Sequence, residues 1–337
     1  IGYAVNDDIR FNASSGGVVT ALLAFVLEQG IIDGAVVTRM SKTRVLEPEP
    51  FIARTKEELV EASKSKYCPV SVNVVMKDIL NSNDDERFAV VGLPCHIHGI
   101  RKAQARNKKL QKKIALCIGL ICSHNNTFWQ VKSLVERIDI REQDIEKVEF
   151  RGHGWPGRFA AILKNGDTVT IPFSEAMTLH NLWFNAVPRC LLCCDLTSEL
   201  ADISCGDPWI PEVTASETMG KTIIITRSKL GERICQEACS ANYIDFKEIS
   251  PDKVKQASDM MRTKKRDINA RFIFRRMFKK KIPVYNTRLL KPNVVSYLRS
   301  LFIYFNTGVS NTTYLRKLTY SLASIEKMLF SVVRRQK

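Results

Sequence analysis

The fold is decided by residues 88–95, which are Phe88-Ala89-Val90-Val91-Gly92-Leu93-Pro94-Cys95. The apolar run over residues 88–92 is typical of a buried strand, and we expect a helix to begin just after it. Residues 114–121 form a second run of this kind, and Cys122 follows it. Because open α/β sheets bind ligands at the ends of their strands, the two cysteines predict a functional site at that edge.

Helices and strands alternate on both sides of these two strands. Thr55 and Glu58 form a capping box for a short helix, and Asn165-Gly166 between alternating runs predicts a hairpin. Apolar periodicity predicts helices over residues 18–27, 55–62, 72–80 and 230–241, and further strands over residues 31–37, 223–226 and 243–246. The sequence therefore predicts an α/β (mixed α+β) fold with mixed sheets flanked by helices.

The net charge of +16 is concentrated at the C-terminal end of the chain. Residues 261–337 carry 19 Lys and Arg side chains against Asp267 and Glu326, a net charge of +17, whereas residues 1–260 carry −1. We therefore expect one large domain over residues 1–258, with an N-terminal part at about 1–82 and a C-terminal part at about 86–250. Residues 259–337 are expected to form a basic, amphipathic helical extension, with helices near 294–305 and 313–333.

No run of 18 uncharged apolar residues and no signal-peptide pattern is found in the sequence, so a cytoplasmic protein is expected. The basic extension, which mixes aromatic and basic residues, suits an anionic membrane surface or an acidic partner subunit, and peripheral attachment to the membrane is the second expectation. No module for the recognition of specific nucleic acid is present. A solvated helical extension is the plainer alternative.

Ten cysteines in a reducing compartment favour metal ligands, redox groups or buried thiols over disulfides. Cys190 and Cys193 form a C-x-x-C pair, whose spacing lets two thiolates hold one metal ion or one corner of an iron–sulfur cluster. The missing ligands are either local, Cys194 and Cys205, or distant, Cys95 and Cys122. The distant pair is favoured because the adjacent side chains of Cys193 and Cys194 diverge. A structural zinc site fits the same thiols, and the other four cysteines are interpreted as buried: Cys68, Cys117, Cys235 and Cys239.

Six segments in order resemble the coenzyme F420 hydrogenase/dehydrogenase beta subunit family, whose members contain FAD and a [4Fe–4S] cluster. They are residues 15–23, 31–37, 65–67, 91–95, 190–195 and 199–204. The resemblance covers about residues 10–250 and implies a fold like that of the F420-reducing hydrogenase beta subunit. Many relatives carry an N-terminal ferredoxin-like module, and none is visible in this sequence.

The resemblance also implies the binding residues. Contacts to FAD fall on Ser15, Gly16, Gly17, Val18, Thr20, Ser65, Lys66, Tyr67 and Asn73. The [4Fe–4S] ligands fall on Cys95, Cys122, Cys190 and Cys193, and Asp195 matches as a residue that orients the cluster loop or caps a turn. Backbone N–H groups at a helix N-terminus after two glycines suit a pyrophosphate. No residue is singled out as catalytic.

The implied function is electron transfer between a hydride carrier, coenzyme F420, and a [4Fe–4S] cluster through FAD, because a flavin exchanges both one and two electrons. Ferredoxin or an iron–sulfur partner subunit would exchange electrons with the cluster. Candidate side chains for the anionic carrier are Arg101, Lys102, Arg151 and Arg158. Two alternatives stay open: a ferredoxin-dependent reductase of an organic substrate on the same fold, and a non-catalytic, membrane-associated adaptor in a cell-surface polysaccharide pathway.

Overall fold

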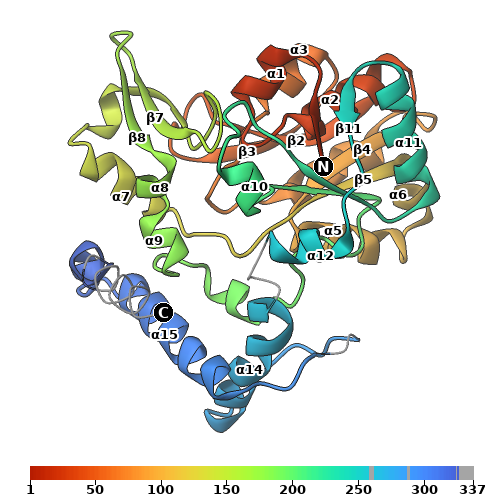
Figure 1. Ribbon diagram of the computed structural model, residues 1–337. Helices are drawn as coiled ribbons and strands as arrows, with labels where there is room; N and C mark the ends of the chain where they lie inside the picture. The colour runs from red at the N-terminus through yellow and green to blue at the C-terminus, as the bar shows by residue number, and fades with distance from the viewer. Residues whose placement is uncertain (258–261, 287–288, 324, 326–337) are drawn as a thin grey trace.

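The computed structural model of the chain describes residues 1–257, 262–286, 289–323 and 325. Its centre is a six-stranded sheet in the order β10-β9-β5-β4-β2-β3 (Figure 1). The four inner strands are parallel, and the two edge strands are antiparallel to their neighbours. The strands are β2 (Gly34–Met40), β3 (Pro48–Ala53), β4 (Phe88–Gly92), β5 (Ile114–Leu120), β9 (Ile203–Gly206) and β10 (Ile223–Thr226). A mixed sheet flanked by helices confirms the predicted fold class.

This sheet has an apolar core on each face because successive side chains of a strand point to opposite sides. In β2, Ala35 and Val37 contribute to one core and Val36 to the other. The first core is covered by α2 (Val18–Glu28) and α11 (Lys229–Ser240). The second is covered by η1 (Val72–Val75), α4 (Met76–Asn81), α5 (Pro94–Gln104) and α6 (Lys108–Lys113).

A smaller antiparallel sheet stands beside the main one and consists of β6 (Ile145–Glu149), β7 (Arg158–Leu163) and β8 (Thr168–Pro172). The predicted Asn165-Gly166 turn joins β7 to β8, and the φ of +92° at Gly166 explains the need for glycine there. The sheet packs against α7 (Trp129–Arg137) and is followed by α8 (Phe173–Ala176), with η2 (Glu142–Asp144) before it.

The two expected parts of the main domain are joined into one body. β2 and β3 from the N-terminal part share the six-stranded sheet with four strands of the C-terminal part. In addition, β1 (Gly2–Ala4) pairs with β11 (Ile244–Phe246), so both ends of this region meet. The remaining short elements are α1 (Asp7–Asn12), α3 (Lys56–Glu61), α9 (Thr178–Asn181), η3 (Pro188–Leu192), α10 (Pro211–Thr214) and α12 (Pro251–Gln256).

The C-terminal extension lies below the body in Figure 1 (blue), and its described helices are separated by a non-helical segment that includes residues 278–286 and 289–293. It comprises a π-helical turn η4 (Thr263–Asp267), α14 (Ile268–Met277), α15 (Val294–Asn311) and η5 (Arg316–Leu318). A capping box between Asn293 and Ser296 begins α15. The stretch predicted at 313–333 lies partly outside the described residues. In the described part of the chain, no helix combines the length and apolarity that crossing a bilayer requires.

Candidate functional site

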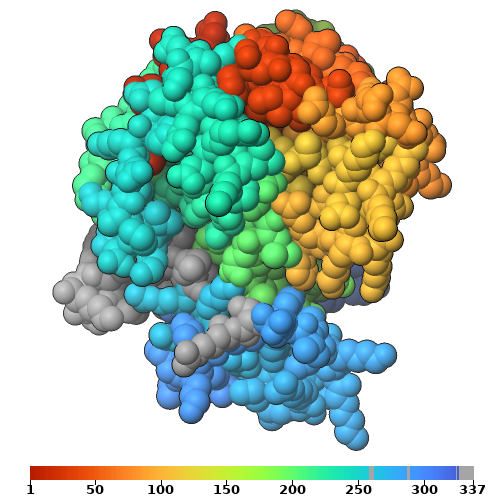
Figure 2. Space-filling model, turned by 90° about the vertical axis from the view of Figure 1, so that its right-hand side faces the viewer, coloured from red at the N-terminus to blue at the C-terminus, as the bar shows by residue number. Residues whose placement is uncertain are grey.

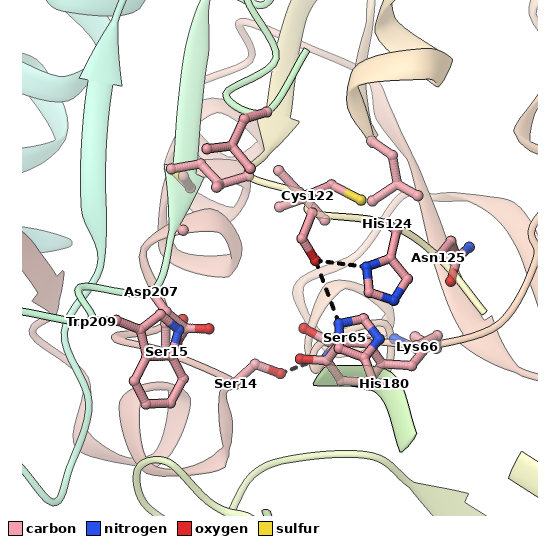
Figure 3. A pocket seen from close by; sticks show the side chains of 18 of the residues that line it. Ser14, Ser15, Ser65, Lys66, Cys122, His124, Asn125, His180, Asp207 and Trp209 are labelled. Atoms are coloured by element: carbon pink, nitrogen blue, oxygen red, sulfur yellow. Dashed lines mark hydrogen bonds between the residues drawn. The ribbon is translucent and has the colours of Figure 1, made fainter. Parts of the chain in front are cut away.

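A cavity of about 1700 Å³ lies at the carboxyl ends of β4, β5 and β9 (Figure 3). Residues that follow each of these strands line it, including Leu93, Cys122 and Asp207. Its other walls come from the N-terminus of α2, the loop at residues 62–68, residues 173–183 and the α15 side chains. The cavity therefore occupies the sheet edge at which the sequence predicted a site.

The N-terminus of α2 provides one wall of the cavity through Gly17, Val18 and Thr20. Gly17 has a φ of +74°, and no side chain caps the helix. The N–H groups of the first helical turn have no acceptor within the helix, so this end of α2 suits an anion. Gly16 has a different role: its N–H donates to Thr222 Oγ1 over 2.9 Å, it does not line the cavity, and a Cβ there would lie 2.9 Å from the carbonyl oxygen of Gly2.

The loop at Ser65, Lys66 and Tyr67 forms the wall beside α2. The backbone N–H of Ser65 donates to Ser14 Oγ over 2.7 Å, which ties this loop to the turn before α2 (Figure 3). Tyr67 is held edge-on against the rings of Phe150 and His180. Both segments predicted to contact FAD thus lie at one cavity.

Lys66 and Asn73 differ from the expectation. The Lys66 ammonium donates to three backbone carbonyl oxygens of residues 62–64, at 2.5, 2.7 and 2.9 Å, so its donors are already used. Burial lowers the pKa of Lys66 to about 7, so the ammonium gives up its proton more readily than an exposed lysine does. Asn73 is exposed in η1 and lies outside the cavity lining.

Asp207 organises the end of the cavity near Ser15. Its carboxylate accepts hydrogen bonds from Ser15 Oγ at 2.6 Å and Trp155 Nε1 at 3.0 Å, and it pairs with Arg151 Nη1 at 2.6 Å. The Arg151 side chain is 1% exposed. Arg151 is thus a buried structural cation, and sequence reasoning missed Asp207 because its partners lie more than fifty residues away.

The other basic side chains proposed for an anionic carrier are also placed elsewhere. Arg101 pairs with Asp202 at 2.9 Å and donates to the Leu200 carbonyl oxygen. Lys102 and Arg158 are exposed, and neither lines the cavity. None of the four predicted side chains therefore offers an uncommitted charge to the cavity.

A stack of rings in the cavity wall, formed by residues that follow Cys122 and by residues 180–183, was not predicted from the sequence. His124 lies between His180 and Trp183, with 4.0 Å between ring centroids on each side. Burial lowers the pKa of His180 to about 4, and burial with the charge of His180 lowers the pKa of His124 well below its ordinary value. Both imidazoles are neutral at pH 7. His124 Nε2 is buried without a hydrogen-bond partner among the described residues, which leaves a polar atom for a ligand.

The four predicted cysteine ligands come from three separate places in the fold, and Cys95 and Cys122 lie within electrostatic range of the C-x-x-C thiols. Cys95 is in the first turn of α5, Cys122 follows β5, Cys190 lies within η3, and Cys193 caps the end of η3. Burial raises the pKa of Cys95, and the charges of Cys190 and Cys193 raise it further. Burial likewise raises the pKa of Cys122, and the other three thiols add to the rise. Such mutual effects require short separations.

The surroundings of these thiols suit a negatively charged group. The backbone N–H of Asn125 donates to Cys190 Sγ over 3.3 Å. Cys194 packs into an apolar cluster with Ile268 and Phe272, and Cys205 is buried in β9. These two cysteines, the alternative ligands near the C-x-x-C pair, thus contribute to apolar packing. Among the described residues, no three His, Cys, Asp or Glu side chains are close enough to hold a single metal ion. Thiolates that share a larger cluster need a wider spacing than ligands of one ion.

Asp195 and His96 support local backbone structure. Asp195 Oδ2 accepts from the Glu199 N–H at 3.0 Å, which caps the turn after the C-x-x-C loop, while Oδ1 is buried without a partner among the described residues. His96 Nδ1 accepts from the Leu93 N–H at 3.3 Å at the start of α5.

The described extension contacts the C-x-x-C loop directly, which the sequence did not predict. Arg271 is fully buried and donates from Nε to the Leu191 carbonyl oxygen over 2.7 Å. Tyr285 Oη donates to the Leu192 carbonyl oxygen over 2.7 Å. Figure 2 shows the blue extension against the green segment of the body. Some of the basic residues that were interpreted as a solvated or membrane-binding tail are therefore buried inside the protein.

The comparisons with known proteins agree with this geometry. Residues 1–77 match the family model for the N-terminal part of the coenzyme F420 hydrogenase/dehydrogenase beta subunit, and residues 85–252 match the model for its C-terminal part. A coenzyme F420 hydrogenase subunit beta from Methanothermobacter thermautotrophicus is 32% identical over 248 residues, which cover 72% of this chain and 81% of that protein. A coenzyme F420-dependent sulfite reductase from Methanocaldococcus jannaschii is 31% identical over 260 residues, 73% of this chain and 37% of that protein.

A chain in the F420-reducing [NiFe] hydrogenase complex from Methanosarcina barkeri superposes with a TM-score of 0.64 at 25% identity, over 84% of this chain and 94% of that chain. Fold and relatives together define an oxidoreductase subunit. The chain belongs to the coenzyme F420 hydrogenase/dehydrogenase beta subunit family, as its motifs predicted.

Proposed function

We propose that this chain is an iron–sulfur flavoprotein subunit that carries electrons between a hydride carrier of the coenzyme F420 type and a [4Fe–4S] cluster. The observation that carries the proposal is the position of Cys122, which lines the cavity and also belongs to the four-thiol group. A group bound in the cavity would lie next to a group held by the thiols. Bound FAD would supply the exchange between two-electron and one-electron transfer.

The size of the cavity supports two occupants. Its volume of about 1700 Å³ exceeds the range of roughly 300–1,000 Å³ usual for one small ligand. The N-terminus of α2 would hold the flavin pyrophosphate, and Tyr67 with the ring stack of His180, His124 and Trp183 would form an aromatic wall. The remaining space would admit the hydride carrier.

The thiol group supports the cluster assignment. Cys95, Cys122, Cys190 and Cys193 supply the four thiolates that a [4Fe–4S] cluster requires, and the Asn125 N–H stabilises negative charge on one of them. A partner subunit or ferredoxin would exchange electrons with the cluster at Cys95, which is the exposed member of the set.

Anaerobic purification tests the proposal. We expect a brown protein that releases FAD on denaturation and contains about four iron atoms per chain. Cys190→Ser and Cys193→Ser should remove the iron, whereas Cys235→Ser, on the buried side of α11, should retain it. Equal iron in the three variants would refute the ligand assignment, and a colourless zinc protein would refute the function.

Reduced coenzyme F420 then tests the direction of transfer. We expect it to bleach the flavin and cluster absorption of the purified protein, and an artificial acceptor should sustain turnover. Reduction by ferredoxin but not by reduced F420 would favour the reductase of an organic substrate. No reduction by either would favour the adaptor function.

A further inference from the structure

The C-x-x-C loop is enclosed by the extension, which continues past the matched family region at residue 252. Two hydrogen bonds from Arg271 and Tyr285 hold the carbonyl groups between Cys190 and Cys193. Lys265 forms an ion pair with Glu199, just beyond the loop. Residues 263–285 therefore belong to the immediate surroundings of the thiol group and not to a separate tail.

Arg271 has one donor group with no use in the described structure. Its Nε donates to the Leu191 carbonyl oxygen and its Nη2 to the Thr263 carbonyl oxygen over 2.9 Å. Its Nη1 is buried and has no hydrogen-bond partner among the described residues. Burial of an N–H group without an acceptor costs free energy. The unpaired Nη1 therefore indicates that a bound group accepts its hydrogen bond.

The position of Arg271 indicates which acceptor is absent. Burial lowers the pKa of Arg271 to about 10, and the charge of Cys193 is among the influences that oppose this shift. The guanidinium thus remains a cation at pH 7 and lies within electrostatic range of a proposed cluster ligand. Cluster sulfurs accept hydrogen bonds from N–H groups.

Lys264 is a second buried cation beside the same thiols. Its side chain is 1% exposed, and it forms no ion pair with a carboxylate in the described part of the chain. Its neighbours in the chain fix its position, because Thr263 lines the cavity and Lys265 pairs with Glu199 just beyond the C-x-x-C loop. An ammonium group buried without a carboxylate needs another source of negative charge.

We propose that Arg271 and Lys264 form a cationic seat for the cluster, in which Arg271 Nη1 donates to a sulfur at the Cys193 corner and Lys264 lies beside Cys122 and Cys190. This inference rests on the proposed function, because it requires a [4Fe–4S] cluster. A [4Fe–4S] cluster held there would gain one negative charge on one-electron reduction. Two fixed cations and an N–H···S bond stabilise that charge, so they raise the reduction potential.

The test is a redox titration of the anaerobically purified full chain, with the reduced cluster measured by electron paramagnetic resonance. Arg271→Gln removes the charge, and Arg276→Gln on the exposed side of α14 is its matched control. We expect Arg271→Gln to decrease the equilibrium constant for reduction about tenfold, or about 59 mV for one electron. Arg276→Gln should leave the potential unchanged.

A second pair keeps the inference testable if Arg271→Gln loses its iron. Lys264→Gln should also lower the potential, whereas Lys280→Gln at an exposed position should not. Iron content equal to that of the unchanged protein, with a potential equal to that of the controls, would overturn the inference and leave the proposed function intact. A chain that binds no cluster at all would instead refute the proposed function.

Discussion

Gly17 shows how a single residue controls the wall of the cavity. Its φ of +74° lies in the left-handed region, and a Cβ would meet the Ile9 carbonyl oxygen at 3.0 Å and Arg10 Cα at 3.1 Å. Any other residue would therefore be strained and would also shift the start of α2. Because the proposed pyrophosphate site is this helix end, backbone geometry and flavin binding depend on the same residue.

Gly17→Ala should lower the free energy of unfolding by about 2 kcal/mol, through left-handed strain and the short backbone contacts. It should also reduce the FAD content of the purified protein. Gly30→Ala is the matched control, because Gly30 has a φ of +63° but open space around it. That variant should lose about 1 kcal/mol and retain its FAD. Urea denaturation and flavin absorbance measure both quantities, and full FAD in Gly17→Ala would contradict the prediction.

His180 predicts an acid-sensitive core. Burial lowers its pKa from 6.5 to about 4, so the unfolded chain binds the proton more tightly than the folded protein does. The stability that this group contributes is complete above pH 6.5 and decreases as the pH falls toward 4. Between pH 7 and pH 5 the loss should be about 2 kcal/mol.

The measurement is urea denaturation at pH 7 and pH 5 for the unchanged protein and for His180→Gln. The variant should lose the part of the pH dependence that comes from this imidazole, although His124 beside it continues to contribute. An identical pH dependence in both proteins would show that His180 does not titrate as its burial indicates.

At the scale of elements, α14 links the extension to the thiol site. Phe272 of α14 is 4% exposed and packs with Ile268 against Cys194, next to the proposed ligand Cys193. Phe272→Ala should cost about 3 kcal/mol of stability and reduce the iron content, because it loosens the C-x-x-C loop. Phe278→Ala, at a side chain that is 74% exposed, should change neither. Normal iron content in a folded Phe272→Ala protein would show that packing of α14 does not support the C-x-x-C loop.

Much of the element pattern could be predicted from the sequence, because it depends on local signals. The capping box of Thr55 and Glu58, the strand at 88–92 and the Asn165-Gly166 turn are all observed. The single helix predicted over 72–80 is divided into η1 and α4, because the β-branched side chains at its start disfavour an α-helical turn. The strand predicted at 31–37 begins at Gly34, since the N–H groups of residues 31 and 32 bond to the end of α2.

From the sequence, only those site residues that belong to a recognisable motif could be predicted. The four cysteines and most of the flavin-loop residues were named through resemblance, and the structure places Cys122 with Ser15, Gly17, Val18, Thr20 and residues 65–67 at one cavity. Asp207, His124 and His180 were missed because their partners are distant in sequence. Lys264 and Arg271 were interpreted as part of a basic tail, because sequence shows charge but not the carbonyl groups that accept from a buried guanidinium.

At the scale of the whole molecule, the extension has an exposed apolar surface beside its buried one. Val294, Leu301 and Phe305 of α15 are between 52% and 74% exposed, and Lys279, Lys280 and Lys281 are exposed in the segment before it. An apolar helix surface combined with clustered lysines suits the interface of an anionic membrane. Peripheral attachment to an anionic membrane through the extension, which the sequence suggested, therefore stays a prediction.

Sedimentation of the full chain with phospholipid vesicles tests this attachment. We expect binding to vesicles that contain anionic lipid, weak binding to neutral vesicles, and a decrease in binding as salt increases. Replacement of Lys279, Lys280 and Lys281 by Gln should weaken binding by roughly two orders of magnitude, at about 1 kcal/mol per Lys. Leu301→Glu with Phe305→Glu should abolish it, whereas Val284→Glu, an exposed position outside α15, should have a small effect. Vesicle binding that neither set of changes alters would contradict the prediction. Absence of vesicle binding by a protein with normal iron content would contradict it as well, and would leave the exposed side of α15 available to a partner subunit.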